Sequence, residues 1–82
     1  MRIDKYLNAV NLTKRRAVAQ DMLANKVVAI NGVVCKPSKD VKVGDKITMT
    51  YLEYVKEYEV LDIPTTKTIP KTEQEKYVKE LS

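Results

Sequence analysis

The residues with the clearest chemistry in this chain are three consecutive cations, Lys14, Arg15 and Arg16, which follow Thr13. Arginine can bind a phosphate through two parallel N–H groups, and lysine adds a compact positive charge. We place these cations in the first turn of a helix that Thr13 caps, where positive charge opposes the helix dipole. Because that placement costs stability, it indicates a binding site for an anion. A solvated run of charges is the alternative.

Two further basic stretches could extend such a site. Arg2 and Lys5 lie near the start of the chain and would join the first cluster if the two helix starts pack side by side. Lys36 and Lys39 lie in the loops of a predicted hairpin, with Lys42 close by. These lysines either contact the same partner or simply solvate the loops.

The distribution of charge agrees with a polyanion as partner. The whole chain has 15 Lys and Arg against 11 Asp and Glu, a net charge of +4. Residues 1–52 hold ten of these cations against four acids, whereas residues 53–82 hold five against seven. Tyr6 is the aromatic residue nearest the cations, and it lies beside the apolar stripe of the first helix. Phosphate contacts without aromatic residues that stack on bases favour structured RNA over sequence-specific single strands.

The same composition excludes several other classes of site. With no His, two Gly and one Cys, the chain lacks the usual general base, a glycine-rich phosphate loop and a ligand set for zinc. Cys35 follows two valines and is expected to be a buried thiol. We therefore predict a protein that is not an enzyme and needs no cofactor or metal. No apolar run approaches the ~18 residues of a membrane span, and the start is charged, so we expect a cytoplasmic protein.

Hydrophobic periodicity predicts two helices at the start of the chain. Ile3, Leu7 and Val10 form one stripe of a helix over residues 3–11. A second helix should run over residues 13–24. Its apolar face would consist of Ala17, Val18, Met22 and Leu23.

After the helices the pattern changes to short β-strands. Asn31-Gly32 lies between two apolar runs, residues 27–30 and 33–35, which is a strong hairpin signal. Residues 46–51 alternate polar and apolar side chains, as expected for a half-buried strand. Residues 55–63 are predicted to form a longer strand.

The end of the chain is predicted to lie outside the sheet. Pro64 should end the last strand, and residues 65–70 should form a linker. Thr72 with Glu75 fits a capping box for a short helix over residues 73–81.

Taken together, these motifs resemble the RNA-binding domain family named after ribosomal small-subunit protein S4. The resemblance covers roughly residues 1–51. Its motifs are, in order, Arg2-Ile3-Asp4-Lys5-Tyr6-Leu7, Lys14-Arg15-Arg16-Ala17, Val28-Ala29-Ile30-Asn31-Gly32, Pro37-Ser38 and Val43-Gly44-Asp45-Lys46-Ile47. The resemblance implies an α+β fold in which two N-terminal helices pack on a small, bent antiparallel sheet. One departure is Lys26, where the family usually has Gly, so Asn25 or Lys26 must take a left-handed turn.

The resemblance also implies roles for individual residues. In the family the basic face of the two helices binds structured RNA, which here corresponds to Arg2, Lys5, Lys14, Arg15 and Arg16. Asp4 belongs to the same face, as a partner that orients a nearby arginine. With Lys36 and Lys39 from the hairpin loops, these are the candidate RNA-binding residues. Among the consecutive cations we expect Arg16 first to face RNA.

Within this family the chain looks most like the stand-alone ribosome-associated members, a heat-shock protein and a P-site factor of ribosome quality control. That likeness implies large-subunit rRNA, tRNA and the ribosome as partners, with a separate quality-control tailing factor as a further one. We expect a monomer with an RNA-binding domain over residues 1–63 and an extension over residues 64–82. The alternative is a protein-interaction module that uses the sheet and this extension, with incidental RNA binding.

Overall fold

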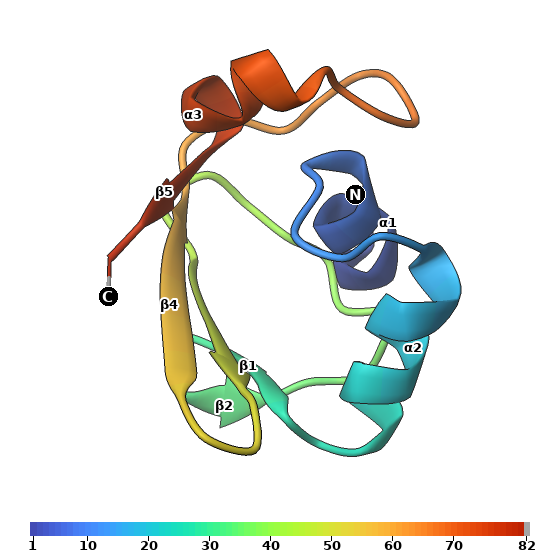
Figure 1. The fold of residues 1–82 in the computed structure, drawn as a ribbon, viewed down its shortest axis with the longest axis vertical. Coiled ribbons are helices and arrows are strands. Elements are labelled where there is room, and N and C mark those ends of the chain that lie inside the picture. Colours follow the sequence, from blue (N-terminus) through green and yellow to red (C-terminus); the bar gives the residue numbers. More distant parts are fainter. Residues whose placement is uncertain (82) are drawn as a thin grey trace.

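The computed structural model describes residues 1–81, which form two N-terminal helices, an antiparallel sheet and a short helix that precedes the last strand (Figure 1). The chain begins with α1 (Ile3–Ala9) and α2 (Arg16–Ala24). The first four strands are β1 (Val28–Ile30), β2 (Val33–Val34), β3 (Lys46–Thr50) and β4 (Val55–Val60). The chain closes with the 3-10 turn η1 (Lys71–Glu73), α3 (Gln74–Tyr77) and β5 (Val78–Glu80). Residue 82, the last of the predicted extension, lies outside the described residues.

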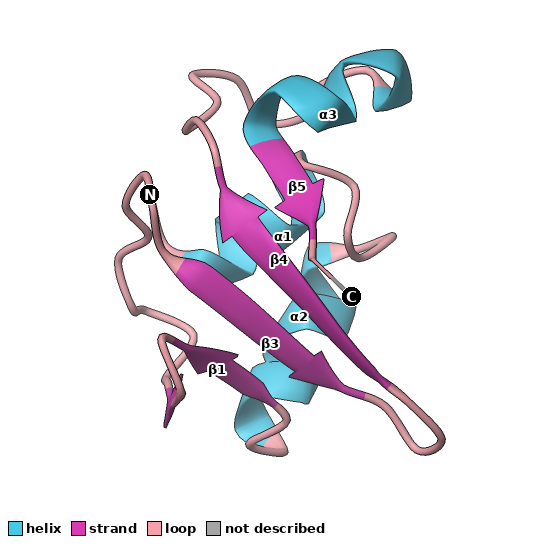
Figure 2. Cartoon of the chain, turned by 90° about the vertical axis from the view of Figure 1, so that its left-hand side faces the viewer, coloured by secondary structure: helices cyan, strands magenta, loops and turns pink. Residues whose placement is uncertain are grey.

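All five strands pair antiparallel, in the order β2-β1-β3-β4-β5. Figure 2 looks onto the open face of this sheet, with α1 and α2 on the opposite face. The predicted α+β class, two N-terminal helices on an antiparallel sheet, is therefore confirmed. The sheet has one strand more than the sequence indicated.

The core lies between the helices and the sheet. In α2 it is Ala19 and Leu23, four residues apart on one side of the helix, that are buried. Ala17 and Val18 are exposed, so the apolar face predicted for this helix was partly wrong. The remaining buried apolar side chains are those of Ile3, Tyr6, Leu7, Ala9, Val10, Val28, Ile30, Val41, Ile47, Met49, Val60, Ile69 and Val78.

The segment after α1 folds back onto the end of that helix. Asn11 has a φ of 63°, and the amides of Thr13 and its predecessor both donate to the Leu7 carbonyl, at 3.1 and 2.9 Å. The end of α1 thus includes Thr13, which was expected to start the next helix. As a result α2 begins only at Arg16, and Arg15 before it is extended. The prediction that Thr13 caps α2 is wrong. Its Oγ1 is buried and has no hydrogen-bond partner within residues 1–81.

The end of α2 settles which residue replaces the glycine of the family. Lys26 takes the left-handed turn with a φ of 61°, while Asn25 has a φ of −83°. The Lys26 amide donates to the Leu23 carbonyl at 3.1 Å, and the Val27 amide donates to the Met22 carbonyl at 3.2 Å. These two bonds form a Schellman motif, which satisfies carbonyls that a helix end leaves open. Lys26 therefore holds a strained backbone at the junction between α2 and β1.

The hairpin between β1 and β2 is confirmed. Asn31 and Gly32 have φ values of 52° and 83°, and Ile30 pairs with Val33 on either side of them. Positive φ at both turn residues matches the twist of the flanking strands. The Asn31 side chain also donates to Asp45 Oδ1 at 3.1 Å, which ties this turn to the one before β3.

Pro64 does not end the sheet, contrary to the prediction. β4 ends at Val60, and after a loop and α3 the chain forms β5, which pairs with β4. In this pairing, Val78 is buried opposite Val60. The Tyr77 carbonyl accepts a hydrogen bond from the Tyr6 hydroxyl at 2.8 Å, which fixes this segment to α1. The end of the chain is thus part of the fold.

The helix predicted over residues 73–81 is wrong beyond Tyr77, because residues 78–80 are a strand. The capping box of Thr72 and Glu75 is also wrong, since α3 begins without a side-chain cap and with Glu73 in the capping position. A helix this short is marginal by itself. The conformation of residues 73–80 is therefore decided by the hydrogen bonds to α1 and by the edge of β4, which would be unpaired without β5.

We predict that Lys26→Gly stabilises the protein by about 0.5–1 kcal/mol. A left-handed residue costs roughly 1–2 kcal/mol when it has a Cβ, and the greater freedom of glycine in the unfolded chain offsets about half of this. Urea unfolding of the wild type and variant measures the difference. Asn25→Gly is the control, because its φ is negative, and it should not stabilise. Equal effects of the two substitutions would contradict the strain at Lys26.

Candidate nucleic-acid interface

A single buried carboxylate joins the starts of α1 and α2. The Asp4 side chain is fully buried, and its Oδ2 accepts hydrogen bonds from Arg2 Nη2 at 3.1 Å and from Arg16 Nε and Nη2 at 3.3 and 3.2 Å. Gln20 donates to the same oxygen at 3.2 Å, and the Lys5 amide donates to Oδ1 at 2.8 Å. The expected pairing of Asp4 with a nearby arginine is present, and it involves two arginines.

These hydrogen bonds decide the charge of Asp4. Burial raises its pKa, but the hydrogen bonds from Gln20, Arg16 and the Lys5 amide outweigh burial, so the pKa lies below its usual value. Asp4 is therefore an anion at neutral pH. Its negative charge allows two guanidinium groups to lie together.

Both arginines remain partly open to solvent. The Arg2 and Arg16 side chains are 47% and 41% exposed, although their partner is completely buried. Arg16 uses one Nε and one Nη donor on Asp4, so of the five donors of a guanidinium about three stay available. Each arginine is thus held in place on one side and can bind an anion on the other.

The remaining cations of the cluster surround this pair. Lys5 is exposed on α1, and Lys14 and Arg15 are exposed in the segment before α2. The prediction that all three consecutive cations occupy the first helical turn was wrong: only Arg16 is helical, with Arg15 at the capping position. The conflict with the helix dipole therefore applies mainly to Arg16, and Asp4 compensates it.

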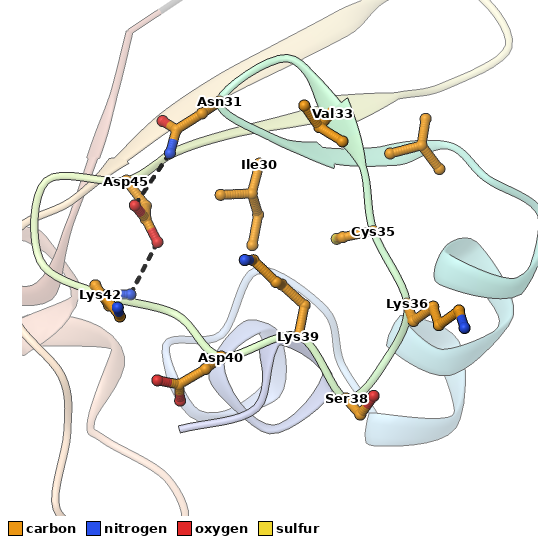
Figure 3. Close-up of a pocket in the computed structure, with 11 residues that line it drawn as sticks. Ile30, Asn31, Val33, Cys35, Lys36, Ser38, Lys39, Asp40, Lys42 and Asp45 are labelled. Atoms are coloured by element: carbon orange, nitrogen blue, oxygen red, sulfur yellow. Dashed lines mark hydrogen bonds between the residues drawn. The ribbon is translucent and has the colours of Figure 1, made fainter.

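The predicted second basic region is a hollow beside β1 and β2, with a volume of about 610 Å³. Figure 3 shows Lys39 reaching across it toward Ile30, whereas Lys36 extends away from it. The Ile3 amide donates to the Lys39 carbonyl at 2.8 Å, so this loop lies against the start of α1. The Lys39 backbone thus lies beside the start of α1, whereas its side chain points into the hollow. Lys36 lies earlier in the same loop.

Of two other side chains, Tyr6 is buried as its place beside the apolar stripe suggests, whereas Cys35 is less buried than expected. Cys35 is half-buried in this hollow, and burial raises the pKa of its thiol despite the nearby positive charge of Lys39. The thiol is thus neutral at neutral pH. Tyr6 is fully buried, which confirms a core role rather than base stacking.

Gln20, which also donates a hydrogen bond to Asp4, was not among the residues predicted from the sequence. Its position one helical turn after Arg16 is the signal that could have identified it, because residues four apart share a face of a helix. Within residues 1–81, no cluster of three or more Asp, Glu, Cys or His side chains could bind a metal. The described helices are all too short or too polar to cross a membrane.

Several known protein sequences are similar to this chain. Residues 1–47 match the S4 domain family. A Helicobacter pylori (strain J99) protein named "RQC P-site tRNA stabilizing factor" is 47% identical over 78 residues, 95% of this chain and 93% of that protein. A Bacillus subtilis protein of the same name is 41% identical over 51 residues, 62% of this chain and 59% of that protein.

Solved structures give the same answer for the fold. The trimeric structure of Vibrio cholerae Heat Shock Protein 15 has a TM-score of 0.89 and 29% identity, covering all of this chain and 82% of that one. The solution structure of a protein described as hypothetical protein HP1423 has a TM-score of 0.87 and 43% identity, covering 100% and 98% of the two chains.

We predict that Asp4→Asn destabilises the protein by about 1–3 kcal/mol at pH 7, because two arginines lose their charged acceptor. The lowered pKa means that this stabilisation is present above the unfolded-state pKa of about 3.9 and is lost as pH falls through the folded-state value. Urea unfolding from pH 7 to pH 3 should therefore show the wild type and variant converging in acid. Asp21→Asn, at an exposed position, is the control and should have no such effect. A pH-independent difference would argue against an ionised Asp4.

Proposed function

This chain belongs to the S4 domain family, and we propose that it is a non-catalytic protein that binds structured rRNA and tRNA on the large ribosomal subunit. The observation that carries the proposal is the pair of arginines fixed by Asp4, with exposed Lys5, Lys14 and Arg15 around them. Two pre-positioned guanidinium groups are suited to the phosphates of a folded RNA, whose backbone spacing is fixed.

The names of the relatives support the biological setting. Proteins similar over nearly the whole chain are named for stabilising a P-site tRNA in RQC, and a structural neighbour is a heat-shock protein. We therefore place the chain in ribosome-associated quality control or the recycling of stalled ribosomes, where the large subunit carries peptidyl-tRNA. A cytoplasmic location and a role beside a separate tailing factor follow from that setting. The proposal includes no catalytic role, since the relatives are named as tRNA stabilizing factors.

The candidate RNA-binding residues fall into two groups in this proposal. Arg2, Lys5, Lys14, Arg15 and Arg16, with Asp4 as their organiser, form the main contact. Lys39 extends this contact through its loop, and Lys36 adds charge farther out. The monomer remains a prediction, whereas the Vibrio cholerae structural neighbour is described as trimeric.

A second candidate function is contact with a protein. Its support is the apolar tip of the β3–β4 hairpin, where Leu52 is fully exposed and Tyr54 is 54% exposed beside Tyr51. The C-terminal segment is less suited to this role than the sequence suggested, because β5 already occupies the edge of the sheet.

We predict that the double variant Lys14→Ala/Arg15→Ala binds large-subunit rRNA about 25- to 60-fold more weakly than the wild type at 0.1 M salt. Each lost phosphate contact lowers the slope of log K against log salt by about 0.7–0.9. At this salt concentration, that change weakens the binding constant about five- to eightfold. Neither side chain contacts Asp4, so the fold should persist. The control is Lys46→Ala/Lys79→Ala, which removes the same charge from the open face of the sheet. If both variants bind equally, the helical face is not the RNA site.

We predict that the tagged protein sediments through a density gradient with free large subunits that carry tRNA. Ribonuclease treatment of the same fractions distinguishes the two candidate functions, because an RNA-held chain would be released and a protein-held chain would not. Migration with small subunits, or with naked RNA alone, would contradict the quality-control setting.

A further inference from the structure

A loop from the end of the chain lies beside the cationic face. Residues 65–68 connect Pro64 to Ile69, both buried, and this loop passes next to α1 (Figure 1). The Ile69 amide donates to the Ala9 carbonyl at 3.0 Å, and the Asn11 side chain donates to the Ile69 carbonyl at 2.9 Å. The loop is therefore anchored at both ends and has a defined place relative to α1.

Between this loop and the helices there is an open hollow of about 510 Å³. Three segments contribute a cation to it: Lys5 from α1, Arg16 from the start of α2 and Lys67 from the loop. The other lining residues are Met1, Asn8, Thr65 and Thr66. The lining thus has three positive side chains and no carboxylate.

The positive charges in this hollow are only partly compensated. Arg16 pairs with Asp4, but within residues 1–81 neither Lys5 nor Lys67 forms an ion pair. Like charges that the fold brings together repel one another, and the repulsion is relieved when an anion binds between them. Lysines that only solvate the surface would be scattered over it, whereas here three cations surround one hollow.

The hollow also contains the neutral hydrogen-bond donors of Asn8, Thr65 and Thr66, which suit an oxyanion. The Thr66 hydroxyl already bonds the Thr68 carbonyl at 3.1 Å, whereas no hydrogen bond of the Thr65 hydroxyl is present in the described part of the chain. The Asn8 amide, by contrast, lies 3.4 Å from the Lys14 carbonyl. Thr65 is thus the hydroxyl free to donate to a ligand.

We propose that Lys5, Arg16, Lys67 and the Thr65 hydroxyl form a site for one phosphodiester group of RNA. The inference rests on the proposed function, and it extends the RNA-binding surface to residues outside the S4 domain match, which ends at residue 47. Residues 53–82 are net acidic, with five cations against seven acids. In this proposal they nevertheless contribute a cation to the RNA face, because Ile69 anchors the loop on α1.

Lys67→Ala tests this site, with Lys71→Ala as the matched control, since Lys71 is exposed on the same segment but does not line the hollow. We expect Lys67→Ala to weaken binding to purified large-subunit rRNA about five- to eightfold at 0.1 M salt and to lower the salt slope by about 0.7–0.9. Lys71→Ala should stay within about twofold of the wild type, and Lys67→Arg should restore affinity because it keeps the charge. Amide shifts of residues 65–67 on titration with a short RNA hairpin provide an independent readout.

The outcomes separate this inference from the function on which it rests. Equal affinities of Lys67→Ala and Lys71→Ala overturn the phosphate site, and if Lys14→Ala/Arg15→Ala still weakens binding, the proposed function stands. If that double variant also binds like the wild type, both are wrong. Unfolding curves of Lys67→Ala that match the wild type ensure that a lost contact, not a lost fold, is measured.

Discussion

The structure depends on one buried negative charge. An isolated carboxylate in an apolar interior costs several kcal/mol, so Asp4 can be buried only where charged donors surround it. These donors come from both helices, with Arg2 and the Lys5 amide on one side and Arg16 and Gln20 on the other. The same hydrogen bonds to Asp4 therefore hold α1 against α2 and orient the two arginines. A substitution that frees the arginines also loosens the helices, which couples the proposed binding face to stability.

The end of the chain imposes a second constraint from the opposite side of α1. β5 covers the edge of β4, and the Tyr6 hydroxyl, buried within α1, reaches the Tyr77 carbonyl just before that strand. The Gln74 side chain donates to the Val10 carbonyl at 2.6 Å, so α3 caps the end of α1 as well. Residues that the S4 match does not include thus hold the first helix of the domain in place. The same contacts set the position of the loop that bears Lys67.

Local signals were sufficient for some elements and misleading for others. Asn31-Gly32 predicted its hairpin because both residues accept positive φ, and the stripe of Ile3, Leu7 and Val10 predicted α1 because one face must be buried. Thr13 does not cap α2 because its segment forms the end of α1. The helix predicted over residues 73–81 stops at Tyr77 because residues 78–80 pair with the edge of β4. In the site, Asp4 and its arginine followed from the family resemblance. Lys67 could not be predicted, since its place depends on contacts between residues about sixty apart in sequence, such as Ile69 with Ala9.

Positive and negative side chains balance each other on the open face of the sheet but not on the helical face. This difference affects how an anion would approach the molecule. On the open face of the sheet, Lys46 and Lys79 lie on either side of Glu59, and Glu57 is nearby on the same strand. The charges of that face cancel. On the helical face Asp4 balances one of two arginines, and Lys5, Lys14 and Arg15 add to the excess. Residues 1–24, which include α1, α2 and the segment between them, hold five cations against two acids, a net charge of +3. Such an asymmetric field turns a charged molecule toward a polyanion before contact, so the chain would meet RNA with its arginines already facing the phosphates.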